Sequence, residues 1–329
     1  GGKNYRLWWW GLYGCDGNRK HKTEGDKRLP FRGCRCCLRS STNSFLMKPI
    51  TNLLIMAGGA SSRMKRFLEN SQLSDATKSI AFSSHKSLIP LGKSQKPLLY
   101  YLIQNAVEAG FTDIYLITSP ENEAFQEWVG NKPNHNSFAG ARVHFVIQHT
   151  PEGRAKPLGT ADAVLQAMDQ YPILKTAYLS LCNGDNFYSV NALNLVHQAR
   201  DTPHALISYA RSGLLFDDER ISKFAVMDID SEDYLKNIIE KPDPEIVEKY
   251  RDGSGEIRVS MNIFSFEGSL LYPYLKNCPI HPERDEKELP EAVRKMSLDE
   301  AHPIRCFPVK EHLPDLTSAD DILTFSTLE

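Results

Sequence analysis

A glycine-rich turn after a run of four apolar residues is the first feature of the chain that could do chemistry. Residues 53–64 read LLIMAGGASSRM, so an apolar strand gives way to Gly58 and Gly59, two serines and Arg63. A buried strand that ends in such a turn presents backbone N–H groups with no side chain in the way, and oxyanions bind that concavity. We therefore expect this stretch to hold a triphosphate through backbone N–H groups and Arg63.

The turn matches neither of the two common phosphate-binding motifs. No Lys-Ser/Thr pair closes it, as a Walker A motif requires, and Arg63 stands where the dinucleotide fingerprint has its third glycine. An ordinary tight turn is the alternative, because short glycine motifs recur by chance.

Two carboxylates could hold a metal ion near the phosphates. Asp185 follows Gly184 at the end of an apolar strand, residues 178–182, so its carboxylate should project into the crevice above the sheet. A Mg²⁺ ion held by one or two carboxylates plus substrate phosphates suits that position, whereas a strand-ending Asp that caps its own turn is the alternative. Asp315 is the best candidate for the second carboxylate, with a helix cap as its alternative.

Further cations could neutralise phosphate charge. Arg63 and Lys86 lie on either side of a polar stretch, residues 65–85, and both could face a leaving pyrophosphate. Lys241 follows Glu240 at the end of a strand, and lysine binds a phosphate monoester as a point charge. Each of these cations, taken alone, is as readily explained as a solvated surface residue.

Alternating strands and helices should position these residues. The apolar patterns predict strands at 53–56, 113–118, 142–148 and 178–182, and helices at 97–109, 121–129, 161–170 (capped by Thr160) and 191–200. This alternation is typical of a doubly wound, mostly parallel sheet with right-handed crossovers, and ligands bind such sheets at the carboxyl ends of the strands.

Beyond Ala205 the predicted strands follow one another without long helices between them. They span 206–210, 223–229, 235–240 and 257–266, and are followed by a helix at 288–296, a strand at 304–309 and a capped helix from Thr317. We expect a smaller, mostly antiparallel lobe there, where a second substrate could bind. One domain, 47–329, would then contain a nucleotide-binding part, 47–204, and a second part, 205–329.

Residues 1–46 differ in composition from the rest of the chain. They hold three of the four tryptophans and four of the seven cysteines, among basic residues and without a helical or alternating period. We expect a leader outside the core that is disordered, artefactual or a targeting extension, with Met47 as the functional start.

The composition favours an ordinary globular enzyme. A chain of 329 residues with 41% apolar and 24% charged residues can bury a full core. The formal charge of −2 argues against a nucleic-acid partner, and no apolar run approaches the roughly 20 residues that span a membrane. Cys182, Cys278 and Cys306 are scattered as in a reducing compartment, so we expect a cytoplasmic protein. The oligomeric state stays open, a homo-oligomer included.

Seven segments together resemble one known family. They are, in chain order, AGGASSRM, KSLIPL, KPLLYYLIQNAVEAG, PLGTADAV, NGDN, EKP and SMNIFSF. In order and spacing they resemble the sugar nucleotidyltransferases, the glucose-1-phosphate thymidylyl- and uridylyltransferases, from about Thr51 to Ile322. The resemblance implies a Rossmann-like α/β/α sandwich with a smaller sugar-phosphate-binding part, 205–329. It also implies Mg²⁺-dependent transfer of NMP from an NTP to a sugar 1-phosphate, which gives an NDP-sugar and pyrophosphate.

The resemblance further implies roles for single residues around the nucleotide. Lys86 would contact the phosphates during transfer, and Gly159 and Thr160 would lie near the base or sugar. The residues expected to hold the triphosphate are Ala57, Gly58, Gly59, Ser61 and Arg63.

The resemblance gives the metal and the acceptor their own residues. Asp185 and Asp315 would hold Mg²⁺, and Arg63, Lys86 and Asp185 would form the catalytic set. On the acceptor side, Glu240 would bind sugar hydroxyls, Lys241 the sugar phosphate, and Asn262 would lie against the sugar.

Departures from the family pattern leave alternatives open. Ala60, Ser61, Ser62 and a long insertion replace the usual Gly-x-Gly-Thr-Arg, and AGGASSRM looks closer to the cytidylyl and molybdopterin-guanylyl transferases. The alternatives are therefore a cytidylyl or guanylyl transferase on a non-sugar phosphate such as phosphocholine, or a catalytically silent regulatory homologue. A glycosyltransferase would be expected to carry an Asp-x-Asp motif, whereas NGDN offers one carboxylate.

Overall fold

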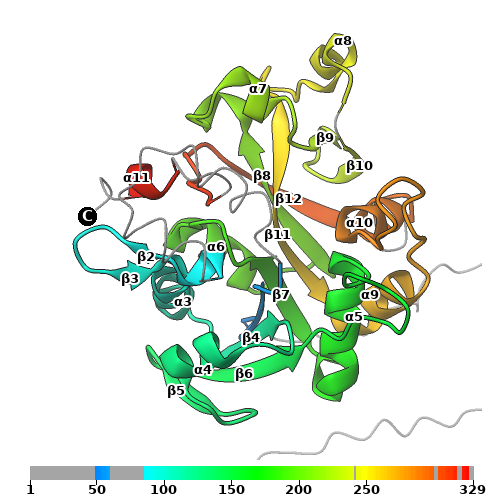
Figure 1. Cartoon of the computed structure of the whole chain (residues 1–329). Coiled ribbons are helices and arrows are strands. Elements are labelled where there is room, and N and C mark those ends of the chain that lie inside the picture. Colours follow the sequence, from blue (N-terminus) through cyan, green and yellow to red (C-terminus); the bar gives the residue numbers. More distant parts are fainter. Residues whose placement is uncertain (1–48, 60–84, 241, 300–302, 317–320, 326–329) are drawn as a thin grey trace, which may run out of the picture. The chain divides into compact units, whose positions relative to one another are not determined.

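Ten strands form one mixed sheet in the part of the chain that the structure describes (Figure 1). The structure is a computed structural model that describes residues 49–59, 85–240, 242–299, 303–316 and 321–325. The strands are β1 (Asn52–Met56), β4 (Asp113–Thr118), β5 (Asn136–Phe138), β6 (Ala141–Ile147), β7 (Tyr178–Asn183), β8 (His204–Ala210), β9 (Val226–Ile229), β10 (Leu235–Ile239), β11 (Arg258–Glu267) and β12 (Ile304–Val309). A separate pair consists of β2 (Pro90–Leu91) and β3 (Lys96–Pro97).

The central strands run parallel. β7, β1, β4 and β6 are neighbours in this order, and each pair is parallel. β11 runs antiparallel to β7, β8 and β9, while β12 pairs with β8 in parallel. This arrangement confirms the expected α/β fold with a mostly parallel, doubly wound centre. The antiparallel strands beyond residue 204 continue the same sheet through β11.

Helices follow the parallel strands and cover the sheet on both faces (Figure 1). The longer ones are α3 (Leu98–Glu108), α4 (Glu123–Val129), α5 (Thr160–Gln170), α6 (Val190–His197), α9 (Gly268–Lys276) and α10 (Leu289–Ser297). The short α-helices are α7 (Asp218–Ile221), α8 (Pro244–Val247) and α11 (Asp321–Phe325), and the described residues also form short 3-10 helices, the first at Lys86–Leu88.

Side chains of β1 alternate between two hydrophobic cores, because successive residues of a strand point to opposite faces. Leu53 and Ile55 belong to the core that α3, α4 and α6 cover. Leu54 belongs to the core that α5, α9 and α10 cover. A strand buried on both faces reads as a continuous apolar run, which is why the glycine turn follows LLIM without a polar break.

Several predicted boundaries differ from the structure. Pro97 was expected to be the first residue of a helix, but it has extended backbone and pairs with Pro90, so α3 begins at Leu98. The strand expected from Lys223 begins only at Val226, because a turn after α7 occupies the preceding residues.

Some expectations lie outside the described residues. These are the leader (1–46), the start at Met47, most of the polar stretch after the glycine turn (60–84) and the cap at Thr317. Of the helices that the structure describes, none has the length and apolar character needed to cross a membrane.

Candidate active site

A cavity of about 460 Å³ lies at the carboxyl ends of β1 and β7. The two strands pair in parallel with Met56 opposite Asn183, so the segments that follow them meet at one edge of the sheet. The N–H of Gly184 donates to the carbonyl of Met56 at 2.9 Å, which fixes this meeting point. Predicted site residues that line the cavity are Ala57, Gly58, Gly59, Lys86, Gly159, Thr160 and Asp185.

The described part of the glycine turn has room for a ligand. A side chain at Gly59 would meet none of the described residues within 4 Å, whereas one at Gly58 would lie 3.4 Å from the backbone of Thr118. Both glycines line the cavity. Ser61 and Arg63, the other residues expected to hold phosphate, lie outside the described residues.

Lys86 and Asp185 form an ion pair at the cavity wall, through Lys86 Nζ and Asp185 Oδ2. The two side chains are 20% and 21% exposed, so each can also reach a ligand in the cavity. Lys86 is held in place by its neighbours, since Ser87 and Leu88 are buried in the same short helix. The pair brings one cation and one carboxylate to the place where phosphates would bind.

The backbone around Asp185 is anchored below the cavity. The hydroxyl of Tyr188 donates to the carbonyl of Met261 at 2.7 Å and accepts from the N–H of Asn183 at 3.3 Å. Burial raises the pKa of Tyr188 well above its ordinary value, so this hydroxyl keeps its proton. Burial likewise raises the pKa of Cys182, which remains a thiol behind the site. Neither group supplies a nucleophile.

Asp315 is brought close to Asp185 along the backbone, and its carboxylate pairs with a different cation. The N–H of Leu316 donates to the carbonyl of Asp185 at 2.8 Å. The carboxylate of Asp315, a residue only 8% exposed, pairs with Arg220, which also pairs with Asp321 at 2.8 Å. The two expected metal ligands are thus paired with different cations.

The Gly159 turn is built around close backbone contacts. Gly159 has φ +112°, and a Cβ there would lie 2.5 Å from the carbonyl oxygen of Lys287. Only glycine fits such a position without strain. The carbonyl of Gly159 accepts from Gln148 Nε2 at 3.0 Å, and the N–H of Ala161 donates to the carbonyl of Lys287 at 3.0 Å.

Thr160 does not cap the helix as expected. It is the first residue of α5, and Gly159 occupies the cap position. The Thr160 hydroxyl oxygen instead accepts from the N–H of Leu289 at 2.9 Å, at the start of α10. The residue still lines the cavity, so its expected place near the nucleotide stays a prediction.

A second cavity of about 490 Å³ lies between β10 and α10. Glu240, the residue expected to bind sugar hydroxyls, lines it, and Glu286 lines both cavities. Lys241 lies outside the described residues. Asn262 lines neither of these two cavities; it has φ +55° in an irregular part of β11, where its carbonyl accepts from Tyr188 at 3.4 Å.

Sequence reasoning missed several polar residues that line the first cavity. Among them are Gln148, Lys156 and Glu286. Gln148 could have been found, since it is the last residue of the predicted parallel strand 142–148, and ligands bind at such strand ends. Lys156 and Glu286 lie in polar loops where no periodic pattern distinguishes them.

Comparison with known proteins decides the family. The sequence profile described as "Nucleotidyl transferase" matches residues 53–311, most of the chain. The chain belongs to this family. The resemblance that the seven segments indicated is thereby confirmed.

Two curated relatives of this nucleotidyl transferase are named for the transfer of different nucleotides. A glucose-1-phosphate thymidylyltransferase of Neisseria gonorrhoeae is 28% identical over 191 residues, which cover 57% of this chain and 55% of the relative. A glucose-1-phosphate adenylyltransferase of Koribacter versatilis is 23% identical over 177 residues, 53% of this chain and 41% of the relative. The bifunctional protein GlmU of Methanococcus maripaludis is 24% identical over 217 residues, 66% of this chain and 43% of the relative. The chain thus spans about half the length of these relatives.

The cavity of this nucleotidyl transferase fits a Mg²⁺ ion through one carboxylate. Asp185 offers a hard oxygen donor at the cavity wall, and Mg²⁺ needs only one or two carboxylates when substrate phosphates and water complete its shell. Within the described ranges, no group of three or more His, Cys, Asp or Glu side chains could hold a metal ion.

Proposed function

We propose that this nucleotidyl transferase moves NMP from an NTP to a sugar 1-phosphate, with release of pyrophosphate and an NDP-sugar. The observation that carries the proposal is the cavity in which the glycine turn meets the Lys86–Asp185 pair. The family membership and the sugar-phosphate activities named for the relatives support it. The product screen described below identifies the base and the sugar.

In the proposed mechanism the cavity positions two phosphates for direct transfer. An oxygen of the acceptor phosphate attacks the α-phosphorus, and the bond from that phosphorus to the pyrophosphate oxygen breaks. The chain need supply no nucleophile, because positioning and charge neutralisation account for such catalysis. Backbone N–H groups of Gly58 and Gly59 would hold phosphate oxygens.

Lys86 would change partners during the reaction. In the structure its ammonium pairs with Asp185. A phosphate oxygen in the cavity would compete for that ammonium, which then neutralises charge on the substrate while Asp185 becomes available for Mg²⁺. Mg²⁺ bound there would neutralise further charge on the phosphates.

The acceptor would lie towards the second cavity. Carboxylates accept hydrogen bonds from hydroxyls, and Glu240 and Glu286 both line that cavity. This assignment places the nucleotide in the part 47–204 and the sugar phosphate against the part 205–329. We also propose a cytoplasmic location, with which the free thiols of Cys182, Cys278 and Cys306 are compatible.

A product screen tests the proposed function. The full chain is incubated with Mg²⁺, each of the common NTPs and dTTP, and a panel containing glucose 1-phosphate, N-acetylglucosamine 1-phosphate and phosphocholine. We expect pyrophosphate release with a sugar 1-phosphate and one preferred nucleotide, and loss of release in Lys86→Met. Release with phosphocholine alone would support the non-sugar alternative. NTP binding without any release would support the silent homologue.

A further inference from the structure

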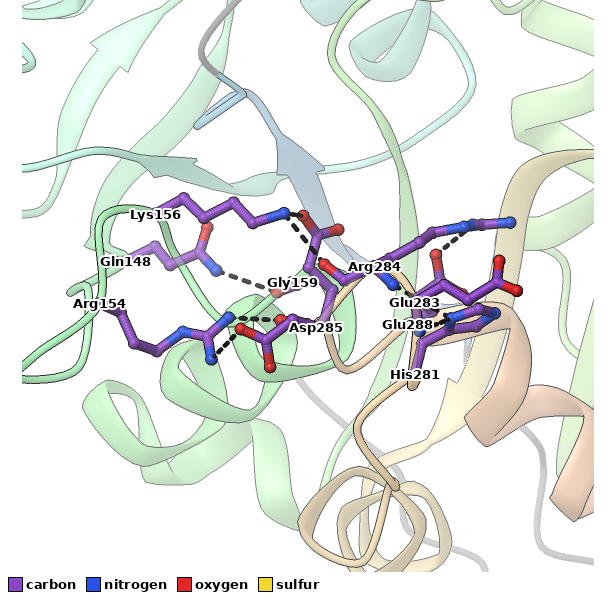
Figure 2. A network of polar contacts seen from close by, with 10 residues as sticks. Gln148, Arg154, Lys156, Gly159, His281, Glu283, Arg284, Asp285 and Glu288 are labelled. Carbon is purple, nitrogen blue, oxygen red and sulfur yellow. Dashed lines mark hydrogen bonds and ion pairs between the residues drawn. The ribbon is translucent and has the colours of Figure 1, made fainter.

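Polar contacts join two loops of the chain (Figure 2), and both loops contribute residues to the lining of the first cavity. The basic loop, residues 151–159, carries Arg154 and Lys156; the acidic loop, residues 281–288, carries Asp285 and Glu286. Lys156 Nζ lies 2.7 Å from Glu286 Oε1 and donates to the carbonyl of Arg284 at 3.0 Å. Arg154 pairs with Asp285 at 2.9 Å and also donates to its carbonyl.

The Lys156–Glu286 pair lies where the two cavities adjoin. Both residues line the first cavity, and Glu286 also lines the second, together with His281 and Glu288 of the same loop. A ligand in either cavity can therefore reach one member of this pair. The Arg154–Asp285 pair lines neither of the two cavities.

The backbone beneath the pair is fixed, so the two side chains can exchange partners without moving the loops. The N–H of Lys287 donates to the carbonyl of Leu158 at 2.6 Å, and the carbonyl of Lys287 accepts from Ala161 at 3.0 Å. These bonds tie the acidic loop to the start of α5.

The pair itself is weak enough to break. The Lys156 side chain is 54% exposed and that of Glu286 33%, and exposed ion pairs contribute little to stability. A phosphate or ribose oxygen can compete for the ammonium, and sugar hydroxyls can compete for the carboxylate. Whichever substrate binds first breaks the pair and leaves the other partner available.

We propose that Lys156 binds the nucleotide, that Glu286 binds the acceptor, and that their ion pair couples the two substrates. This inference rests on the proposed function. The first substrate must break the ion pair to bind its residue. The second substrate then binds a residue that is already released from the pair. Binding of each substrate therefore strengthens binding of the other, by the same factor for both. An exposed pair of this kind corresponds to a factor of about five at most.

Calorimetric titration of the full chain measures this coupling. The probes are the unreactive α,β-methylene analogues of ATP, UTP and dTTP, each titrated with Mg²⁺ in the absence and presence of glucose 1-phosphate. For the analogue that binds, we expect glucose 1-phosphate to lower Kd several-fold. Glu286→Gln should bind the analogue more tightly without glucose 1-phosphate, and show no further tightening with it. Lys156→Met should bind the analogue more weakly and also lose the coupling.

The matched control is Asp285→Asn, which removes the same charge from the neighbouring residue. It should keep the coupling and an analogue Kd within twofold of the wild type, because Asp285 faces Arg154 instead of the cavities. Equal effects of Glu286→Gln and Asp285→Asn would overturn the inference, since they would reflect general charge. Binding of an NTP analogue and of glucose 1-phosphate by the wild type, without any coupling between them, would overturn the inference as well. Failure of the wild type to bind any of these probes, together with no pyrophosphate release in the product screen, would overturn the proposed function too.

Discussion

At the scale of single residues, the candidate site consists of charged side chains that pair with each other and that would pair with the substrate when it binds. Lys86 and Asp185 neutralise each other at the cavity wall, and both are exposed enough to take a new partner. Asp315, by contrast, is buried and paired with Arg220. We therefore assign the larger role in catalysis to Asp185, and metal binding by Asp315 stays a prediction.

Gly159→Ala should destabilise the protein by about 2 kcal/mol or more, because the backbone conformation there suits only glycine and a Cβ would meet Lys287. Gly153→Ala is the control, since Gly153 also has positive φ (+79°) but a Cβ there would meet none of the described residues within 4 Å. Urea unfolding measures both variants. Equal losses in the free energy of unfolding would show that the contact with Lys287 does not contribute to the effect of Gly159→Ala.

At the scale of elements, polar groups lie at both ends of the parallel strands. At the amino ends, opposite the site, Asp113 at the start of β4 accepts from Arg142 at 2.8 Å and lies 3.1 Å from His144 Nε2. His144 stacks on Tyr115 with ring centroids 4.6 Å apart. Burial lowers the pKa of His144 below its ordinary value, although hydrogen bonding to Asp113 opposes this. The folded protein therefore holds this histidine neutral.

The stability of the protein should fall as the pH drops from about 7 to about 5. The unfolded chain takes up a proton on His144 near its ordinary pKa of about 6.5, whereas the folded chain takes it up only at lower pH. His144→Phe keeps a stacked ring and should flatten this dependence; the exposed His149 provides a control, His149→Gln, that should not. Urea unfolding at pH 5, 6 and 7 gives the comparison. An unchanged slope in His144→Phe would refute the assignment.

At the scale of the whole molecule, the sequence predicted the sheet better than the side-chain partners. The apolar runs of β1, β4, β6 and β7 are local patterns, and parallel strands must bring their carboxyl ends together, so the meeting of Gly58 with Asp185 followed. The continuation of the sheet through β11 did not follow, because pairing between strands of unlike direction leaves no local signal.

Local sequence patterns could not predict the ion pairs of the site. Lys156 and Glu286 lie 130 residues apart in polar loops, where no periodicity indicates burial or partner. The pairing of Asp315 with Arg220 is likewise a tertiary contact, and it gives the two expected metal ligands different cationic partners. The resemblance to the family identified residues that line the cavity, but it did not identify the ion pairs around the cavity.

Asp185→Asn tests the central claim most directly. The steady-state rate of pyrophosphate release is measured with the NTP and sugar 1-phosphate that the screen identifies, beside Asp169→Asn, which changes an Asp that pairs with Lys175 outside both cavities. We predict a loss in kcat of about 100-fold or more for Asp185→Asn, with an unchanged melting temperature, and little change for Asp169→Asn. A folded Asp185→Asn variant with near wild-type kcat would contradict the account.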